Sequence, residues 1–191
     1  MTGKTHQVIG QALGVGLLVS LADGHYHPAT GAATIVACSI SSLLPDIDTP
    51  AAKIWQYLPF GLGKVGGHLV KPFLQHRNIT HSLVGAALVG EILWQVGLRV
   101  PTYWGINASF VWFVTMAAYL SHLSADALTV EGIPLLFPWS HSFGFPSHPF
   151  QGLRIETGKW FENFVVYPLV VCTLVTEILW NWPVIRTVFL L

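Results

Sequence analysis

Five apolar stretches, separated by polar or aromatic connections, run along this 191-residue chain. We interpret each as a membrane helix and therefore expect an all-α, polytopic bundle of about five spans with interfacial loops. The first two hold about 15 residues each, fewer than the roughly 20 that cross a bilayer, so flanking residues must extend them or the bilayer must thin. The five stretches are Val8–Ala22, Ala29–Leu44, Ser82–Leu98, Ile106–Leu128 and Phe164–Trp182.

Small residues line one side of the first stretch. Gly10, Gly14 and Gly16 recur at a spacing that would let a second helix approach closely, although flexibility explains them equally well. A cleaved signal peptide ending at Ser20-Leu21-Ala22 is another interpretation of this segment. Against it, Gly and Gln interrupt the apolar core, and cleavage would discard His6.

The composition is that of a membrane protein. Only 9% of the residues are Asp, Glu, Lys or Arg, against roughly 25% in a soluble domain, and 52% are apolar. We therefore treat residues 1–191 as a single integral membrane domain whose partners are membrane lipids. A formal net charge of zero argues against a nucleic-acid partner, because binding to phosphates requires clustered Lys and Arg. The oligomeric state is left open.

The cysteines and histidines narrow the chemistry. Cys38 and Cys172 both fall within apolar stretches, so the chain has neither a disulfide framework nor a Cys-rich zinc site. Nine histidines set against few carboxylates instead suggest metal or proton chemistry.

Loop charges predict the orientation. The segment from 46 to 80 holds Lys53, Lys64, Lys71 and Arg77, whereas the connection from 23 to 28 has no Lys or Arg, so the long loop should be cytoplasmic. Counting crossings from there places the amino terminus and the 129–160 loop inside as well. The last residues, 184–191, either turn along the interface or lead back into the membrane.

Two acidic motifs sit at the ends of apolar stretches. His122 and Asp126 are four residues apart, so they share one helix face about 6 Å apart and could bind one ion or two adjacent ones. A hydrogen bond closing the helix end is the alternative. Asp46 and Asp48 follow Pro45, which disfavours a continuing helix, so a turn could aim both carboxylates at one cation. Solvated aspartates are the alternative there.

A third motif begins the third stretch. At Thr80-His81-Ser82, free backbone amides and the helix dipole attract anions such as phosphate. His76 can fold over the site if residues 76–80 form a loop, and Arg77 can clamp a phosphate or simply anchor at the headgroups. His6 at the start of the first stretch is, by itself, typical of an interfacial residue. The predicted topology brings all these positions to the cytoplasmic face, which indicates a metal site at the lipid surface.

Three motifs carry a resemblance to a known family. They are Leu44-Pro-Asp46-Ile-Asp48-Thr-Pro50, His76-Arg77-x-x-Thr80-His81-Ser82, and His122-x-x-x-Asp126-x-x-Thr129 followed by Gly132–Leu136. The chain resembles the YdjM-type inner-membrane metal-dependent hydrolases, a family whose named member is under LexA control in the DNA-damage (SOS) response. The motifs cover residues 1–140, and the tail 150–191 matches nothing.

The resemblance implies a bacterial inner-membrane protein with hydrolase activity, assigned through distant similarity to zinc-dependent phospholipase C. The metal-ligand types of that fold look like His6, Asp46, His81, His122 and Asp126 here. Asn78-Ile79 stands where Gly and an aromatic residue are usual, and Thr129-Val130 where Thr-Pro is usual. Because the phospholipase cluster uses more ligands than this chain supplies, one or two ions are expected.

The resulting hypothesis is a membrane-bound hydrolase in which one or two Zn²⁺ or similar divalent ions activate water against a lipid phosphoester at the cytoplasmic leaflet. Asp48 would serve as a further ligand or general base, His76 as a general acid or base, and Arg77 as the phosphoryl clamp. Two alternatives stay open. One is a metal or proton transporter, whose ligands would lie near the midplane, and the other is a regulatory protein that binds metal only for folding.

Overall fold

The structure, a computed structural model, describes residues 1–22, 26–49, 52–57, 79–139 and 141–190. Within those ranges the fold is all-α, as predicted, and the only β features are two isolated bridges, Thr129 with Ile155 and Ile133 with Phe143. The α-helices are α1 (Gly3–Ala22), α2 (Pro28–Ser41), α4 (Leu83–Gly97), α5 (Ala108–Ala127), α6 (Tyr167–Trp180) and α7 (Trp182–Leu190). Each of the five predicted stretches overlaps one of the first five of these helices, and α1 begins five residues before its stretch.

Polar caps set where the helices begin. The Ser82 hydroxyl accepts a hydrogen bond from Gly85 N at 3.1 Å at the start of α4. The side chain of Asn107 does the same for Phe110 N at 3.0 Å at the start of α5. Such caps satisfy amides that the first helical turn leaves without partners, so the apolar stretches begin where the sequence supplies a cap.

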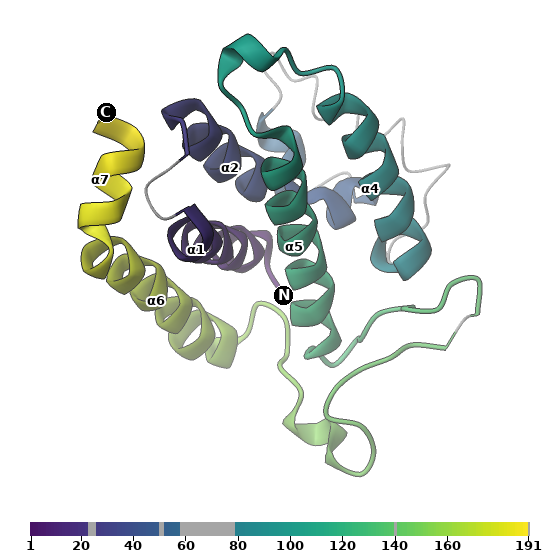
Figure 1. Cartoon of the computed structure of the whole chain (residues 1–191). Helices are drawn as coiled ribbons and strands as arrows, with labels where there is room; N and C mark the ends of the chain where they lie inside the picture. Colours follow the sequence, from purple (N-terminus) through teal and green to yellow (C-terminus); the bar gives the residue numbers. More distant parts are fainter. Residues whose placement is uncertain (23–25, 50–51, 58–78, 140, 191) are drawn as a thin grey trace.

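Helix α5 is the centre of the bundle (Figure 1). It packs against α1, α2 and α4, while α6 lies along the other side of α1 and α7 folds back onto α2. Two short 3₁₀ turns, η1 (Leu44–Asp48) and η4 (Ile79–His81), join this core at the end of α2 and the start of α4. The carboxyl-terminal residues therefore return to the bundle.

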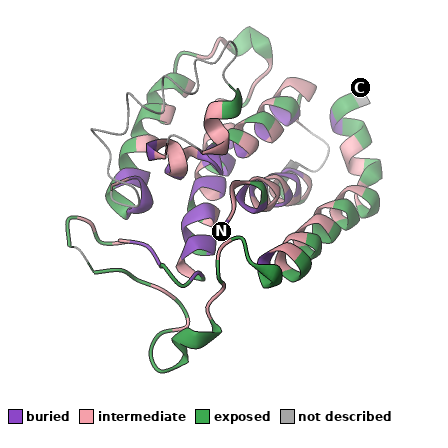
Figure 2. Cartoon of the chain, turned by 180° about the vertical axis from the view of Figure 1, so that it is seen from behind, coloured by how far each residue is buried: buried purple, intermediate pink, exposed green. Residues whose placement is uncertain are grey.

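The distribution of polarity is the reverse of that in a soluble protein. Several of the buried residues are polar, among them Thr30, Thr34 and Ser42, whereas α4 and α6 expose Ile92 and Leu169 at more than 60% (Figure 2). Such an apolar exterior fits contact with lipid chains. In the part of the chain described, two helical segments, 108–127 and 162–180, are long and apolar enough to cross a membrane. The count of five crossings stays a prediction.

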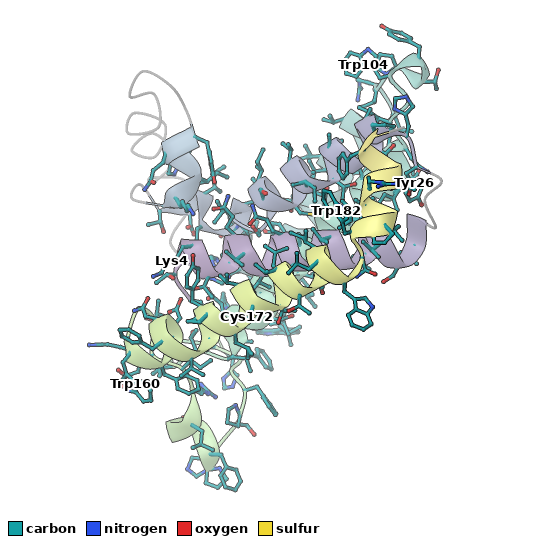
Figure 3. The ribbon with its side chains drawn as sticks, turned by 90° about the vertical axis from the view of Figure 1, so that its left-hand side faces the viewer. Lys4, Tyr26, Trp104, Trp160, Cys172 and Trp182 are labelled. Carbon is teal, nitrogen blue, oxygen red and sulfur yellow. The ribbon has the colours of Figure 1, made fainter. Side chains whose placement is uncertain are left out.

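Aromatic residues gather toward both ends of the molecule. Trp104, in the connection between α4 and α5, and Trp160, just before α6, lie at opposite ends (Figure 3). Both indole rings are largely exposed. Tryptophan side chains favour the headgroup layer on either side of a bilayer, so this separation fits a molecule that spans one.

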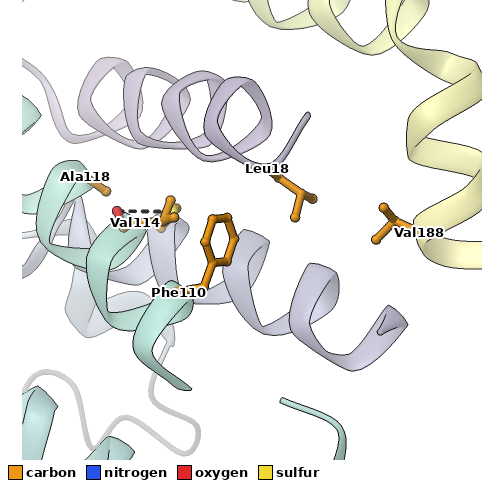
Figure 4. Close-up of a cluster of buried hydrophobic side chains, with 6 residues drawn as sticks. Leu18, Phe110, Val114, Ala118 and Val188 are labelled. Atoms are coloured by element: carbon orange, nitrogen blue, oxygen red, sulfur yellow. Dashed lines mark hydrogen bonds between the residues drawn. The ribbon is translucent and has the colours of Figure 1, made fainter. Parts of the chain in front are cut away.

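A small apolar cluster joins α1, α2, α5 and α7 (Figure 4). Its packing depends on glycines in α1. A Cβ added at Gly14 would lie 2.8 Å from Cys38 Sγ, and one at Gly10 would lie 2.6 Å from Ser42 Cβ. Gly10 and Gly14 therefore form the predicted small-residue face, and α2 packs against it. The cluster comprises Leu18, Cys38, Phe110, Val114, Ala118 and Val188.

We expect Gly10→Ala to destabilise the protein by about 1–3 kcal/mol, because the added methyl group must push the end of α2 away from α1. The measurement is denaturant unfolding in detergent micelles, followed by circular dichroism. Gly152→Ala is the matched control, since a Cβ there meets nothing within 4 Å. Equal stability of the two variants would contradict a close α1–α2 approach.

Candidate metal centre

The five residues proposed as ligands come together at one end of the bundle. Helices α1 and α4 begin there and α2 and α5 end there, so each successive helix reverses direction around the same point. The side chains come from the first turn of α1, from η1 and η4, and from the last two turns of α5. They are His6, Asp46, His81, His122 and Asp126.

Burial makes this an unusual place for charge. His6, His81 and His122 are inaccessible to solvent, and Asp126 is nearly so. The Asp46 side chain, at 20% exposed, is the most accessible of the five. Buried carboxylates require compensating charge, so this cluster needs protons or a cation to be stable.

Two imidazole nitrogens each lie at a similar distance from the same two carboxylate oxygens. Nε2 of His81 lies 3.5 Å from Asp46 Oδ1 and 3.6 Å from Asp126 Oδ2. Nε2 of His122 lies 3.7 Å from each of the same two oxygens. Ligand atoms about 2.0–2.1 Å from a tetrahedral zinc ion are separated by about 3.3–3.4 Å. The nitrogen–oxygen separations are therefore only slightly longer than those around one ion of this size.

His6 approaches the other oxygen of Asp126. Its Nε2 lies 3.0 Å from Asp126 Oδ1, and its ring stacks on that of His122 with centroids 3.6 Å apart. The ligand atoms of His6, His122 and Asp126 form a second group within 4.8 Å of one another, which shares His122 with the group of Asp46 and His81. The arrangement can thus hold one ion, or two bridged by the Asp126 carboxylate, whose Oδ1 faces His6 and whose Oδ2 faces His81 and His122.

Outer hydrogen bonds turn two of the imidazoles toward the centre. His122 Nδ1 donates to the carbonyl oxygen of Ser42 at 2.7 Å, which leaves Nε2 as the atom with a free lone pair. His81 Nδ1 donates to Thr80 Oγ1 at 3.2 Å, and that hydroxyl donates to Asp48 Oδ2 at 3.1 Å. Metal-binding histidines commonly have such partners, which fix the tautomer and the ring orientation.

Asp48 occupies a different place from the one that its motif suggested. Its buried carboxylate lies behind His81, joined to it through Thr80, and it belongs to neither group of ligand atoms found in the described part of the chain. His76 and Arg77 lie outside the described residues, so their roles as acid or base and as phosphoryl clamp stay predictions.

Neighbouring charges and hydrogen bonds shift the pKa values of Asp46 and His81, which lie outside the helical spans. Burial alone would raise the pKa of Asp46, but hydrogen bonding to His81 and the charges of His122 and His6 lower that pKa to about 2. Burial would likewise lower the pKa of His81, yet its hydrogen bonds with Asp126 and Asp46 raise it above the ordinary value. In the metal-free site these contacts therefore favour the protonated form of His81 beside ionised Asp46.

Sequence reasoning missed several members of the site. The Met1 amino group forms an ion pair with Asp126 Oδ1, and the buried Glu162 hydrogen-bonds to Thr2 and Thr5 at the start of α1. Nothing in the sequence signals that the Ser42 carbonyl is the partner of His122. Glu162 did carry a signal, because an isolated acidic residue at the edge of an apolar stretch needs a partner.

The chain is similar to a known protein family over nearly its whole length. A family model described as YdjM inner membrane protein matches residues 1–190, so the match also covers residues 150–190 of the tail, which the three motifs do not reach. The inner membrane protein YdjM of Escherichia coli K12 is 34% identical over 135 residues, 69% of this chain and 60% of that protein, and its Shigella flexneri counterpart matches equally. The chain thus spans about 60% of the length of these two curated relatives.

A second kind of relative covers more of the chain. The uncharacterized protein YvsG of Bacillus subtilis 168 is 31% identical over 166 residues, which are 87% of this chain and 88% of that protein. No solved structure matches the chain.

We expect His122→Ala to abolish stoichiometric zinc binding, because His122 is the member common to both groups of ligand atoms. Asp126→Ala should weaken binding at least as much, since it also removes the carboxylate that faces His6. Metal content after dialysis, measured by plasma mass spectrometry on the detergent-purified protein, checks both. His141→Ala, at an exposed position, is the control. Unchanged zinc in both site variants would refute the ligand set.

Zinc affinity should fall as the pH is lowered from about 8 to about 5.5. The sign follows from His81, whose raised pKa keeps it protonated to a higher pH than a free imidazole, and the ion binds only the neutral ring. Asp46, with a pKa of about 2, stays ionised over this pH range and therefore does not contribute to the pH dependence of zinc affinity. Calorimetric titration with zinc at several pH values measures the effect, and an affinity independent of pH would contradict it.

Proposed function

Because the chain belongs to the YdjM inner membrane protein family, we propose that it is a membrane-bound, metal-dependent hydrolase acting on a phosphoester of a lipid or other amphiphile. The observation that carries this proposal is that two imidazole nitrogens, of His81 and His122, each lie 3.5–3.7 Å from the same two carboxylate oxygens, of Asp46 and Asp126.

The donor set favours zinc. Imidazole nitrogen suits zinc and other transition metals better than Mg²⁺ or Ca²⁺, which prefer oxygen ligands only. His81, His122, Asp46 and Asp126 would hold the ion, with His6 at the second group of ligand atoms. When bound, the ion supplies a water with a pKa near 7 and polarises a phosphoryl oxygen.

The chain's own residues would orient and bind. Ser42 and Thr80 would keep the two imidazoles turned toward the centre, and Asp48 accepts a hydrogen bond from Thr80. The part of Asp48 as a further ligand or general base stays a prediction. The partial exposure of Asp46 marks the side from which water and substrate would enter. His76 would move a proton at the leaving group, and Arg77 would clamp the phosphoryl oxygens.

The depth of the ligands supports a lipid headgroup as the substrate. His6 lies in the first turn of α1 and Asp126 in the last turn of α5, so the site lies at an end of the bundle. Transporter sites usually lie near the bilayer midplane on broken helices, which this arrangement does not resemble. With the long Lys-containing loop inside, that end would face the cytoplasm of a bacterial inner membrane.

A purely structural metal site is the second candidate. Four protein donors complete a tetrahedral shell, and closed shells are typical of structural zinc, whereas catalytic zinc keeps one position for water. The two candidates differ in whether the bound ion keeps a water molecule, and therefore in turnover.

We expect the purified protein to release a water-soluble phosphorylated product from at least one member of a panel of phospholipids and phosphorylated lipid precursors in mixed micelles. A chelator should abolish the release and added zinc should restore it. Asp46→Asn should lower turnover about 100-fold or more, because it removes a charged ligand at the open side of the site.

The control is Glu156→Gln. It removes an exposed carboxylate of the 129–160 loop that is not among the five ligands, so it should leave turnover unchanged. A protein that holds stoichiometric zinc yet turns over nothing in the panel would favour the structural candidate.

A further inference from the structure

A second buried carboxylate lies beside the candidate metal centre, and it belongs to the tail. Glu162 opens the π-helical turn η7 (Glu162–Val166) that leads into α6, and it is inaccessible to solvent. Its Oε1 accepts hydrogen bonds from Thr2 N at 2.7 Å, Thr2 Oγ1 at 2.6 Å and Thr5 Oγ1 at 2.6 Å. Its Oε2 accepts one from Gly158 N at 2.7 Å. Both oxygens are thus fully engaged.

These contacts cap α1 from a distant part of the sequence. The first amides of a helix have no partners within it, and a negative charge at that end also interacts favourably with the helix dipole. Glu162 meets both needs at the residue just before α1, although 160 positions separate it from Thr2. Helix α6 then runs beside α1 in the same direction, with Glu177 next to Gly16 (Figure 3).

His6 follows Thr5 directly. The hydrogen bonds from Thr2 and Thr5 to Glu162, called the Glu162 clamp below, therefore hold the backbone that carries His6. His6 differs here from the other two histidines of the site. His81 and His122 each direct Nδ1 at a hydrogen-bond acceptor, whereas Nδ1 of His6 is buried without a hydrogen-bond partner among the described residues. The orientation of the His6 ring therefore depends on its stacking on His122, on the 3.0 Å approach of its Nε2 to Asp126 Oδ1, and on the position of the first turn of α1.

We propose that Glu162 is a positioning residue for the metal centre: by clamping Thr2 and Thr5, it sets His6 against His122 and Asp126. The inference rests on the proposed metal site and assigns the tail of the chain a part in it. Glu162 touches neither the donor atoms nor a substrate, and it acts through the first turn of α1. Helix α6 is thereby tied to the centre by one side chain.

The test uses the full-length protein in detergent, with Co²⁺ as the probe, because its visible absorption reports the geometry of its ligands. Glu162→Gln should weaken Co²⁺ binding about tenfold, the usual effect of losing an outer partner, and change the visible bands while the far-ultraviolet circular dichroism stays native. Glu156→Gln is the matched control, since it removes an exposed carboxylate six residues away.

A pair of substitutions at the other end of the clamp gives an independent measure. Thr5→Val keeps the shape but removes the hydroxyl that donates to Glu162, so it should change Co²⁺ binding in the same direction as Glu162→Gln. Thr5→Ser keeps the hydroxyl and should restore the wild-type spectrum. This pair decides the question if Glu162→Gln does not fold.

Nuclear magnetic resonance of the metal-free protein, labelled with ¹⁵N-histidine, separates positioning from metal binding. The His6 signals, assigned by their loss in His6→Gln, should shift in Glu162→Gln and Thr5→Val, while those of exposed His141 should not. Native Co²⁺ spectra together with unmoved His6 signals in both variants would overturn the inference and leave the hydrolase proposal intact. A wild-type protein that binds no Co²⁺ would instead refute the metal site, and the His6 signals would still show whether Glu162 positions that ring.

Discussion

The constraint on which this structure depends is the burial of the Asp126 carboxylate, and the partial burial of Asp46, among apolar helices. An ion removed from water costs several kcal/mol even after the protein relaxes, unless opposite charge and hydrogen bonds compensate it. Here the compensation comes from imidazoles on three separate elements and from the Met1 amino group, which forms an ion pair with Asp126. The ends of four helices must therefore meet at one point, and the antiparallel order of the bundle follows from that requirement.

Close packing of α1 and α2 makes the meeting point possible. Gly10 allows the end of α2 to approach within contact distance of α1, which places Ser42 where its carbonyl reaches His122. Tyr119, one turn before His122, donates to the Thr80 carbonyl at 2.5 Å and so joins α5 to the residue that orients His81. The same contacts thus fix both the metal centre and the packing of the bundle, so a substitution that changes the packing also displaces the ligands.

The sequence was informative wherever a local pattern had a local cause. The apolar stretches that begin at Ser82 and Ile106 predicted helices that begin within a few residues of their observed positions. The pair His122 and Asp126 followed from helical spacing, and the meeting of all the motifs followed from alternating topology. His6 needed the family resemblance, because one histidine at a helix start has no pattern. Glu162 and the Ser42 carbonyl were missed because their partners lie 160 and 80 positions away.

The charge of the site bears on how many ions it can hold. Asp46 and Asp126 together neutralise one divalent cation, so a single ion leaves the cluster without net charge in surroundings of low dielectric constant. A second ion near His6 and Asp126 Oδ1 would add two positive charges that no carboxylate among the five ligands offsets. A phosphoester carries the missing negative charge. The electrostatics thus favour one ion in the resting site and a second only together with an anionic substrate, so occupancy of the His6 side should depend on phosphate.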